Sequence, residues 1–130
     1  MRFHHIGVAT NNIALTAQQY SIFGYEILSE TIFDPIQNVH IAFMEKEGSP
    51  RVELVAPVNE NSPILNTINK NGTIPYHFCY EVDNIIEEVK KLKKLKFILI
   101  SKIVPAVVFE NRLVCFLYNR DAGLIELLNK

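Results

Sequence analysis

Two histidines and two glutamates recur in this chain at almost the same spacing, and imidazoles and carboxylates are common metal ligands. Glu53 follows His5 by 48 residues, and Glu126 follows His77 by 49 residues. Two neutral imidazoles and two carboxylates would balance the charge of one divalent ion, and a six-coordinate ion would keep two positions for water or substrate. The repeated spacing therefore predicts one metal site, built from two halves of the chain.

The repeat extends beyond these four residues, which indicates that the chain contains two related halves. A shift of 72 positions brings FHHIGVATNNI onto PYHFCYEVDNI, and each segment reads as a strand followed by an Asn or Asp that can cap a helix. The halves end alike, in RVELVAP and LIELLNK, with one extra residue in the second half. A loop insertion or a bulge adds a residue in this way.

Each half is predicted to contain a strand, a helix and three further strands. In the first half we expect a helix over 12–23 that ends at Gly24, with strands over 3–9, 25–31, 39–44 and 51–56. In the second half we expect a helix over 84–95, with strands over 77–82, 97–103, 112–118 and 123–128. Core-facing stripes on the two helices are predicted at Ile13, Ala17 and Tyr20, and at Ile85, Val89 and Leu92.

A linker helix is predicted over about 62–72, between the halves. Ser62 is a good N-cap residue, Pro63 suits the first helical position, and Gly72 ends the pattern. The chain thus reads as a single α+β domain with module 1 at about 1–57 and module 2 at about 75–130. The segment 102–111 is the least regular, because Pro105 interrupts a strand-like run.

Strand alternation selects which side chains can share a site. Adjacent residues of a strand point to opposite faces, so only one of His4 and His5 can enter it, and the repeat selects His5. Glu53 and Glu126 each lie between two apolar residues. Taken singly, each histidine reads as a structural residue and each glutamate as a solvent-face residue. A buried carboxylate needs a partner, however, and the recurrence of all four residue types in order favours a metal as that partner.

Composition bounds the class of protein. With 130 residues, 48% of them hydrophobic and 21% charged, the chain has the size of one domain with a covered core. A formal charge of −1 argues against a nucleic-acid partner. No apolar run approaches 20 residues and no secretory signal is visible, so we expect a cytoplasmic protein with no membrane partner.

Three further features are assigned to structure rather than chemistry. The lysine run of the second helix predicts a solvated face, with a phosphate-binding patch for a nucleotide-tailed substrate as the alternative. Cys79 and Cys115 lie in apolar runs and form no CxxC pair, so we expect buried thiols. His40 has no partner in the repeat and is expected to be structural, the alternative being that it lines the pocket. No P-loop, dinucleotide fingerprint or nucleophile elbow is present.

Taken together, FHHIGVA, RVELVAP, ENSPILNTINKNG, PYHFCYEVDNI and AGLIELL resemble the vicinal oxygen chelate superfamily over nearly the whole chain, especially its methylmalonyl-CoA epimerase and glyoxalase I branch. The resemblance implies two βαβββ modules whose curved mixed sheets enclose one divalent metal. It places the first-strand ligands at His5 and His77 and the last-strand ligands at Glu53 and Glu126. The metal is cobalt, nickel, zinc, manganese or iron, between which this ligand set does not choose.

The resemblance also implies a chemistry. A metal that polarises a carbonyl makes the neighbouring C–H acidic, so removal and return of a proton give epimerisation or isomerisation. Glu126 is the expected general base. One position departs from the epimerases, which carry an acidic residue where this chain has Ile36. Two-base epimerisation would then need a substitute group, for which Glu30 and Asp34 are the candidates.

Three function classes follow. The first is a metal-dependent isomerase or epimerase acting next to a carbonyl, on a small molecule such as a CoA or carrier thioester. The second is a glyoxalase-like lyase or an antibiotic-modifying enzyme, and the third is a non-enzymatic antibiotic-binding protein of the same fold. Retention of all four ligands argues against the third, and a fourth protein ligand argues against an iron dioxygenase. Members of this superfamily often form homodimers, so a homodimer is expected.

Overall fold

The computed structural model describes all residues from Met1 to Lys130. Its contacts divide the chain into two compact units. The first unit is His5–Tyr76, and the second combines Met1–His4 with His77–Lys130. The linker helix is therefore part of the first unit. No helix is both long and apolar enough to span a bilayer.

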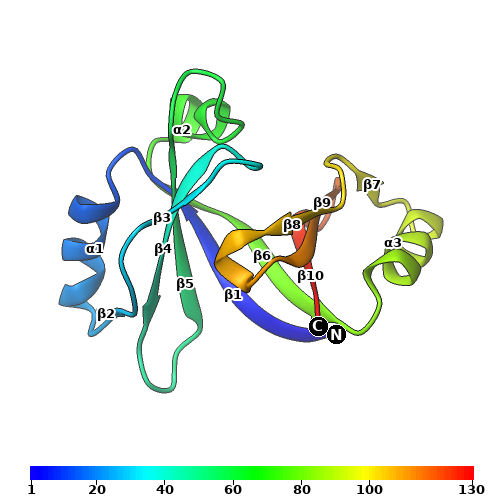
Figure 1. Cartoon of the computed structure of the whole chain (residues 1–130), viewed down its shortest axis with the longest axis horizontal. Helices are drawn as coiled ribbons and strands as arrows, with labels where there is room; N and C mark the ends of the chain where they lie inside the picture. The colour runs from blue at the N-terminus through cyan, green and yellow to red at the C-terminus, as the bar shows by residue number, and fades with distance from the viewer. The chain divides into compact units, whose positions relative to one another are not determined.

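The first unit has an α+β architecture with a mixed sheet (Figure 1). Its strand order is β2-β4-β5-β1, where β1 and β5 run parallel, β4 and β5 run antiparallel, and β3 also pairs with β4. Helix α1 contacts β4 and β5. The elements are β1 (Arg2–Ala9, whose first three residues belong to the second unit), α1 (Ile13–Ile22), β2 (Glu26–Ile27), β3 (Ile32–Asp34), β4 (Val39–Glu45), β5 (Arg51–Pro57) and α2 (Leu65–Asn71).

The second unit repeats this arrangement with the strand order β6-β10-β9-β7. β6 and β10 run parallel, β9 and β10 run antiparallel, and β8 also pairs with β9. Helix α3 contacts β7 and β10. The elements are β6 (Ile74–Val82), α3 (Ile85–Lys94), β7 (Ile98–Leu99), β8 (Val104–Ala106), the 3-10 turn η1 (Val107–Phe109), β9 (Arg112–Asn119) and β10 (Gly123–Asn129). The predicted tandem βαβββ pattern is confirmed.

Both long helices begin at the predicted caps. The side-chain oxygen of Asn12 accepts a hydrogen bond from the Leu15 backbone at 3.0 Å, and that of Asn84 accepts one from the Glu87 backbone at 3.2 Å. Gly24, at φ +93°, supplies the left-handed residue that ends α1.

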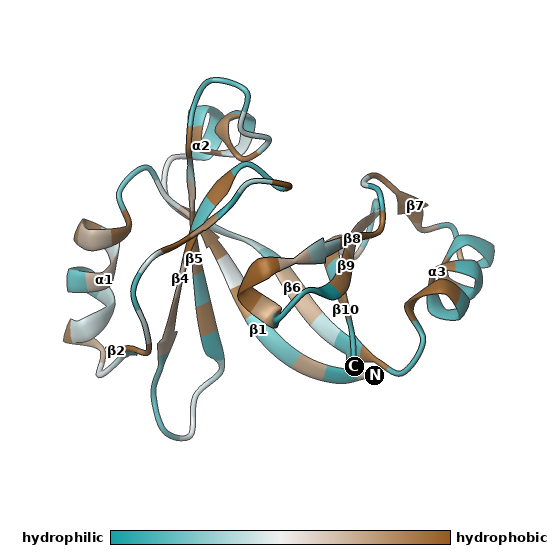
Figure 2. Ribbon diagram, in the orientation of Figure 1, coloured by the Kyte–Doolittle hydropathy of each residue, from teal (hydrophilic) through white to brown (hydrophobic).

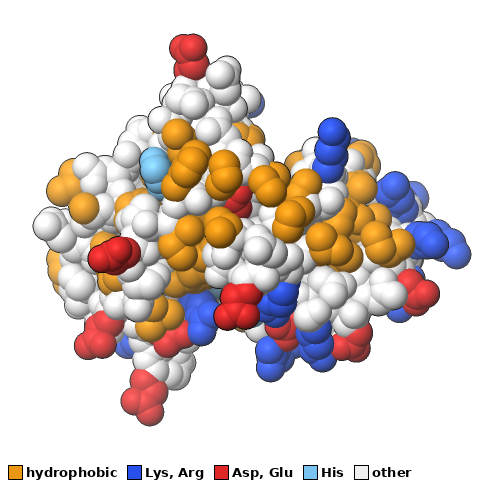
Figure 3. All heavy atoms as spheres, in the orientation of Figure 1, with side chains coloured by type: hydrophobic (Ala, Val, Ile, Leu, Met, Phe, Trp, Pro, Cys, Tyr) orange, Lys and Arg blue, Asp and Glu red, His pale blue; other side chains and the backbone are white.

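The predicted apolar stripes of both helices pack into hydrophobic clusters, with Ala17 buried in one and Ile85, Val89 and Leu92 buried in the other. Figure 2 shows α3 brown on one side and teal on the other. Its lysine run is exposed, and blue side chains extend from this region in Figure 3.

The strands predicted over 25–31 and 97–103 are wrong in their extent. In each unit the edge strand breaks after a short pairing, as β2 then β3, and as β7 then β8. Leu28 and Ile100 still donate backbone hydrogen bonds to the neighbouring strand. The three residues that follow each of them, 29–31 and 101–103, then lie opposite a single residue of that strand. A bulge disturbs the alternation from which strand length is predicted, so the prediction treated a broken edge strand as one continuous element.

The start of the linker helix is also corrected. Helix α2 begins at Leu65, and Ile64 at its N-cap makes no side-chain capping bond. Ser62 is buried, where its hydroxyl accepts hydrogen bonds from the backbones of Val58 and Asn59 and donates one to the Asn38 carbonyl at 2.7 Å. The serine thus closes the loop that precedes the helix. Pro105 lies within β8 opposite Leu113, a peripheral strand position that tolerates the missing N–H.

Candidate functional site

The first predicted ligand pair meets inside the first unit. Gly7 lies opposite Glu53 in the parallel register of β1 and β5, and His5 is two residues earlier on the same face. The His5 Nε2 and Glu53 Oε2 atoms are 3.4 Å apart, with side-chain exposures of 0% and 4%. Parallel pairing of the first and last strands therefore makes neighbours of two residues that are far apart in the sequence.

The second predicted pair repeats this geometry inside the second unit. Cys79 lies opposite Glu126 in the register of β6 and β10, and His77 is two residues earlier on the same face. The His77 Nε2 and Glu126 Oε2 atoms are 3.1 Å apart, with side-chain exposures of 0% and 3%. We call His5 with Glu53 the first half-site, and His77 with Glu126 the second half-site.

A phenylalanine that the sequence analysis missed packs against each half-site. Phe43 lies opposite Glu53 in the register of β4 and β5, and Phe116 lies opposite Glu126 in that of β9 and β10. The Phe43 ring meets His5 edge-to-face at 5.5 Å and 79°, and the Phe116 ring meets His77 at 5.3 Å and 81°. A signal was present in the sequence, because each phenylalanine precedes its glutamate by ten residues.

The donor atoms of each half-site fit a divalent metal. Imidazole nitrogens and carboxylate oxygens bind such ions at about 2.0–2.2 Å, so two ligands at a right angle lie roughly 3.0 Å apart. The observed separations of 3.4 Å and 3.1 Å are close to this value. Burial also favours a metal here, because a carboxylate removed from water is stabilised by a nearby cation. Each unit therefore presents one imidazole and one carboxylate suited to a metal.

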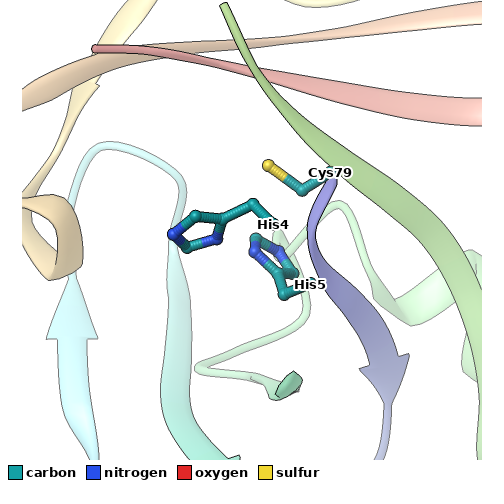
Figure 4. A group of neighbouring side chains, drawn as sticks. All are labelled: His4, His5 and Cys79. Atoms are coloured by element: carbon teal, nitrogen blue, oxygen red, sulfur yellow. The ribbon is translucent and has the colours of Figure 1, made fainter. Parts of the chain in front are cut away.

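His40 and the two cysteine thiols are not among the four predicted ligands. His40 lies opposite Ala56, on the sheet face away from Glu53, which favours the structural assignment; that assignment stays a prediction. Cys115 and Cys79 are both buried, as predicted. Burial, with the nearby Glu126 carboxylate, raises the pKa of Cys115 to about 12, which keeps this thiol protonated. Cys79, whose side chain is drawn in Figure 4, alternates with His77 along β6 and so shares its sheet face.

The loop that departs from the epimerase pattern carries no available acid. Ile36 is 56% exposed, whereas Asp34 is completely buried. The Asp34 carboxylate accepts hydrogen bonds from the backbones of Ile36 and Gln37 and from the Gln37 side-chain amide, all within 2.9–3.0 Å. These bonds hold the turn between β3 and β4, so Asp34 has a structural role. Glu30 is exposed and lies in the three-residue bulge between β2 and β3.

Comparison with known proteins identifies the family. The sequence profile of the Glyoxalase/Bleomycin resistance protein/Dioxygenase superfamily matches residues 4–116. The chain is 34% identical to the mitochondrial methylmalonyl-CoA epimerase of Homo sapiens, over 97% of this chain and 72% of that protein. It is 29% identical to the ethylmalonyl-CoA/methylmalonyl-CoA epimerase of Cereibacter sphaeroides, over 97% of this chain and 96% of that protein.

Solved structures agree with this assignment. A hypothetical protein from Bacillus halodurans C-125 matches with a TM-score of 0.86 at 30% identity, covering 99% of this chain and 94% of that one. Methylmalonyl-CoA epimerase from Mycobacterium tuberculosis matches with a TM-score of 0.83 at 20% identity, covering 98% and 87% of the two chains, and so shares the fold. The chain belongs to the glyoxalase/bleomycin resistance protein/dioxygenase superfamily, also called the vicinal oxygen chelate superfamily, and is similar to its methylmalonyl-CoA epimerases.

Proposed function

We propose that this protein is a divalent-metal-dependent isomerase or epimerase that moves a proton at the carbon next to a carbonyl or thioester. In this proposal both half-sites bind one ion, with His5, Glu53, His77 and Glu126 as its ligands. The observation that carries the proposal is the buried His–Glu pair, which occurs in equivalent positions of both units. Two separate structural ion pairs would not need to recur at the same register.

The chemistry follows from the donor set and its surroundings. When bound, a divalent metal polarises a carbonyl oxygen and so acidifies the neighbouring C–H. The Glu126 carboxylate is proposed to accept that proton and to return it. Its strand neighbours Cys79 and Leu128 are fully buried, so bulk water is excluded beside this carboxylate. Phe116 and Phe43 hold the two imidazole rings by edge-to-face packing.

An acyl-CoA thioester is the proposed substrate class. The relatives named above are methylmalonyl-CoA and ethylmalonyl-CoA epimerases. A Streptomyces coelicolor methylmalonyl-CoA epimerase of the same fold, with a TM-score of 0.81 at 20% identity over 100% of this chain and 97% of that one, is described in complex with 2-nitronate-propionyl-CoA. A homodimer and a cytoplasmic location stay predictions.

A glyoxalase-like lyase or isomerase that uses a single base is the second candidate. It is favoured by the loop at Ile36, which carries no carboxylate, and by Asp34, whose oxygens are occupied by the turn. One-base chemistry would exchange a substrate proton without inverting the carbon. Dependence on glutathione would separate this candidate from a thioester epimerase.

Elemental analysis of metal per chain is the direct test, with wild type compared to the double variant Glu126→Ala, His77→Ala. We expect about one divalent ion per wild-type chain and none in the variant. The metal-loaded protein is then incubated in deuterated water with methylmalonyl-CoA, and separately with a glutathione hemithioacetal. Deuterium uptake with inversion supports the epimerase, whereas turnover of the hemithioacetal alone supports the lyase. If wild type holds no metal after reconstitution, both enzyme proposals fail.

A further inference from the structure

A second cluster of charge lies in the second unit, away from the half-site. Glu81 of β6 is 5% exposed and is held between two arginines. Its Oε1 atom accepts a hydrogen bond from Arg2 at 2.5 Å, and its Oε2 atom accepts one from Arg112 at 2.8 Å. Two arginines and one glutamate together have a net charge of +1. A buried carboxylate here needs only one arginine, so the second cation leaves this corner positive.

Arg112 is fixed in orientation although it is partly open to solvent. Its Nε atom donates to the Phe109 carbonyl at 3.3 Å, and its guanidinium lies 5.7 Å from the Phe109 ring centroid. The His4 ring also packs edge-to-face on the Phe109 ring, at 5.4 Å between ring centroids. The Arg112 side chain nevertheless remains 35% exposed, and that of Arg2 73% exposed. A guanidinium held in place with donors left over is preorganised to bind an anion.

Glu81 and Arg112 lie on the same sheet face as the second half-site, and Arg2 is joined to them through its hydrogen bond to Glu81. His77, Cys79 and Glu81 alternate along β6 and so share one face. The same spacing occurs on β9, where Phe116, which contacts His77, and Arg112, which binds Glu81, are also four residues apart. Four residues of strand span about 13 Å. A ligand bound at the half-site could therefore contact the arginines only if it is long enough to cover this distance along the sheet.

We propose that Arg2 and Arg112, held by Glu81, bind a phosphate group in the tail of the substrate. The inference rests on the proposed function, because it takes the acyl head to be at the half-site. A short dicarboxylic acid cannot reach both places. A pantetheine tail can, since about thirteen bonds separate its sulfur from the first phosphate, which at the rise of an extended polypeptide is roughly 15 Å. The arginines then select a phosphorylated thioester over a free acid.

Binding of three tail compounds tests the proposal on the intact protein: coenzyme A, 4′-phosphopantetheine and pantetheine, which has no phosphate. Wild type should bind the first two at least tenfold more tightly than pantetheine by isothermal titration. Arg112→Gln and Arg2→Gln should each weaken the binding of both phosphorylated compounds several-fold and leave pantetheine unchanged. Arg120→Gln, an exposed arginine of the β9–β10 turn, is the matched control and should bind as wild type does. Rising salt should weaken the phosphorylated compounds only.

Several outcomes would overturn the inference. Equal affinity for all three compounds, or loss of affinity in Arg120→Gln as large as in Arg112→Gln, would mean that these arginines only tie β1, β6 and β9 together. Tight binding of coenzyme A without tight binding of 4′-phosphopantetheine would place the anion elsewhere in the tail. Metal content and proton exchange are measured on the same samples. If both persist in wild type while the tail preference is absent, the enzyme proposal stands and only the arginine site fails.

Discussion

Phe116 lies directly opposite Glu126 in the antiparallel register of β9 and β10, so one register position supplies a carboxylate and the ring that packs on its histidine partner. The same relationship occurs between Phe43 and Glu53 in the first unit. Residues directly opposite in an antiparallel pair lie close together on one face. The orientation of each imidazole is therefore set by the strand that neighbours its carboxylate.

The first prediction concerns this ring packing. Phe116→Leu keeps an apolar side chain but removes the ring edge against His77, so the imidazole gains rotational freedom. We expect a 10- to 100-fold loss of metal affinity, a typical effect of losing an orienting neighbour of a ligand. Competition with a chelator measures it. Phe78→Leu is the control, because Phe78 lies on the opposite face of β6 and is 46% exposed. Equal losses in both variants would show a general packing effect.

The second prediction separates the base from a mere ligand. Glu126→Gln retains an oxygen ligand but cannot accept a proton, so deuterium exchange should fall by about 10²–10⁴-fold while metal remains bound. Glu53→Gln makes the same chemical change in the equivalent position of the first unit and should keep exchange within tenfold. A larger loss in Glu53→Gln would move the base to the first half-site.

The third prediction tests whether the half-sites act together. If both bind one ion, His5→Ala and His77→Ala should each reduce bound metal from about one per chain to near zero. Chelator should also lower the melting temperature of wild type, since an ion at 100 times its Kd stabilises the folded state by about 2.7 kcal/mol. A single-histidine variant that retains the full metal content would contradict a shared site.

The fourth prediction concerns pH and Glu81. The hydrogen bond from Arg112, supported by the charge of Arg2, lowers the pKa of Glu81 from its usual 4.5, although burial opposes this shift. A lowered folded-state pKa stabilises the protein above pH 4.5, and this stabilisation is lost as the pH falls through the folded-state value. Glu81→Gln should therefore cost about 1–3 kcal/mol of unfolding free energy at pH 7. The difference from wild type should shrink below pH 4 in urea titrations, and a constant difference would exclude a charge effect.

The fifth prediction assigns Asp34 to structure. Asp34→Ala removes three hydrogen bonds from the β3–β4 turn and should cost about 2–3 kcal/mol of unfolding free energy. Gln37→Ala, which removes only the side-chain bond, should cost about 1 kcal/mol. Deuterium exchange per folded molecule should be unchanged in both variants. Loss of exchange in Asp34→Ala alone would make this aspartate the missing second acid.

The sequence alone determined the elements that repeat. The recurrence of His5 and Glu53 as His77 and Glu126 predicted two related units, and the periodicity of Ile85, Val89 and Leu92 predicted the buried side of α3. These predictions succeeded because they depend on local patterns. An apolar residue every three or four positions defines a helix face, and alternation defines a strand face.

Tertiary structure decided what depends on pairing between distant segments. The parallel register of β1 with β5 brought His5 to 3.4 Å from Glu53, and the neighbouring strand added Phe43. The bulge at 29–31, the burial of Ser62 and the arginines on Glu81 were likewise not predicted. Strand register is set by which faces must be buried across the sheet, and a single strand's sequence does not specify its partner residue by residue.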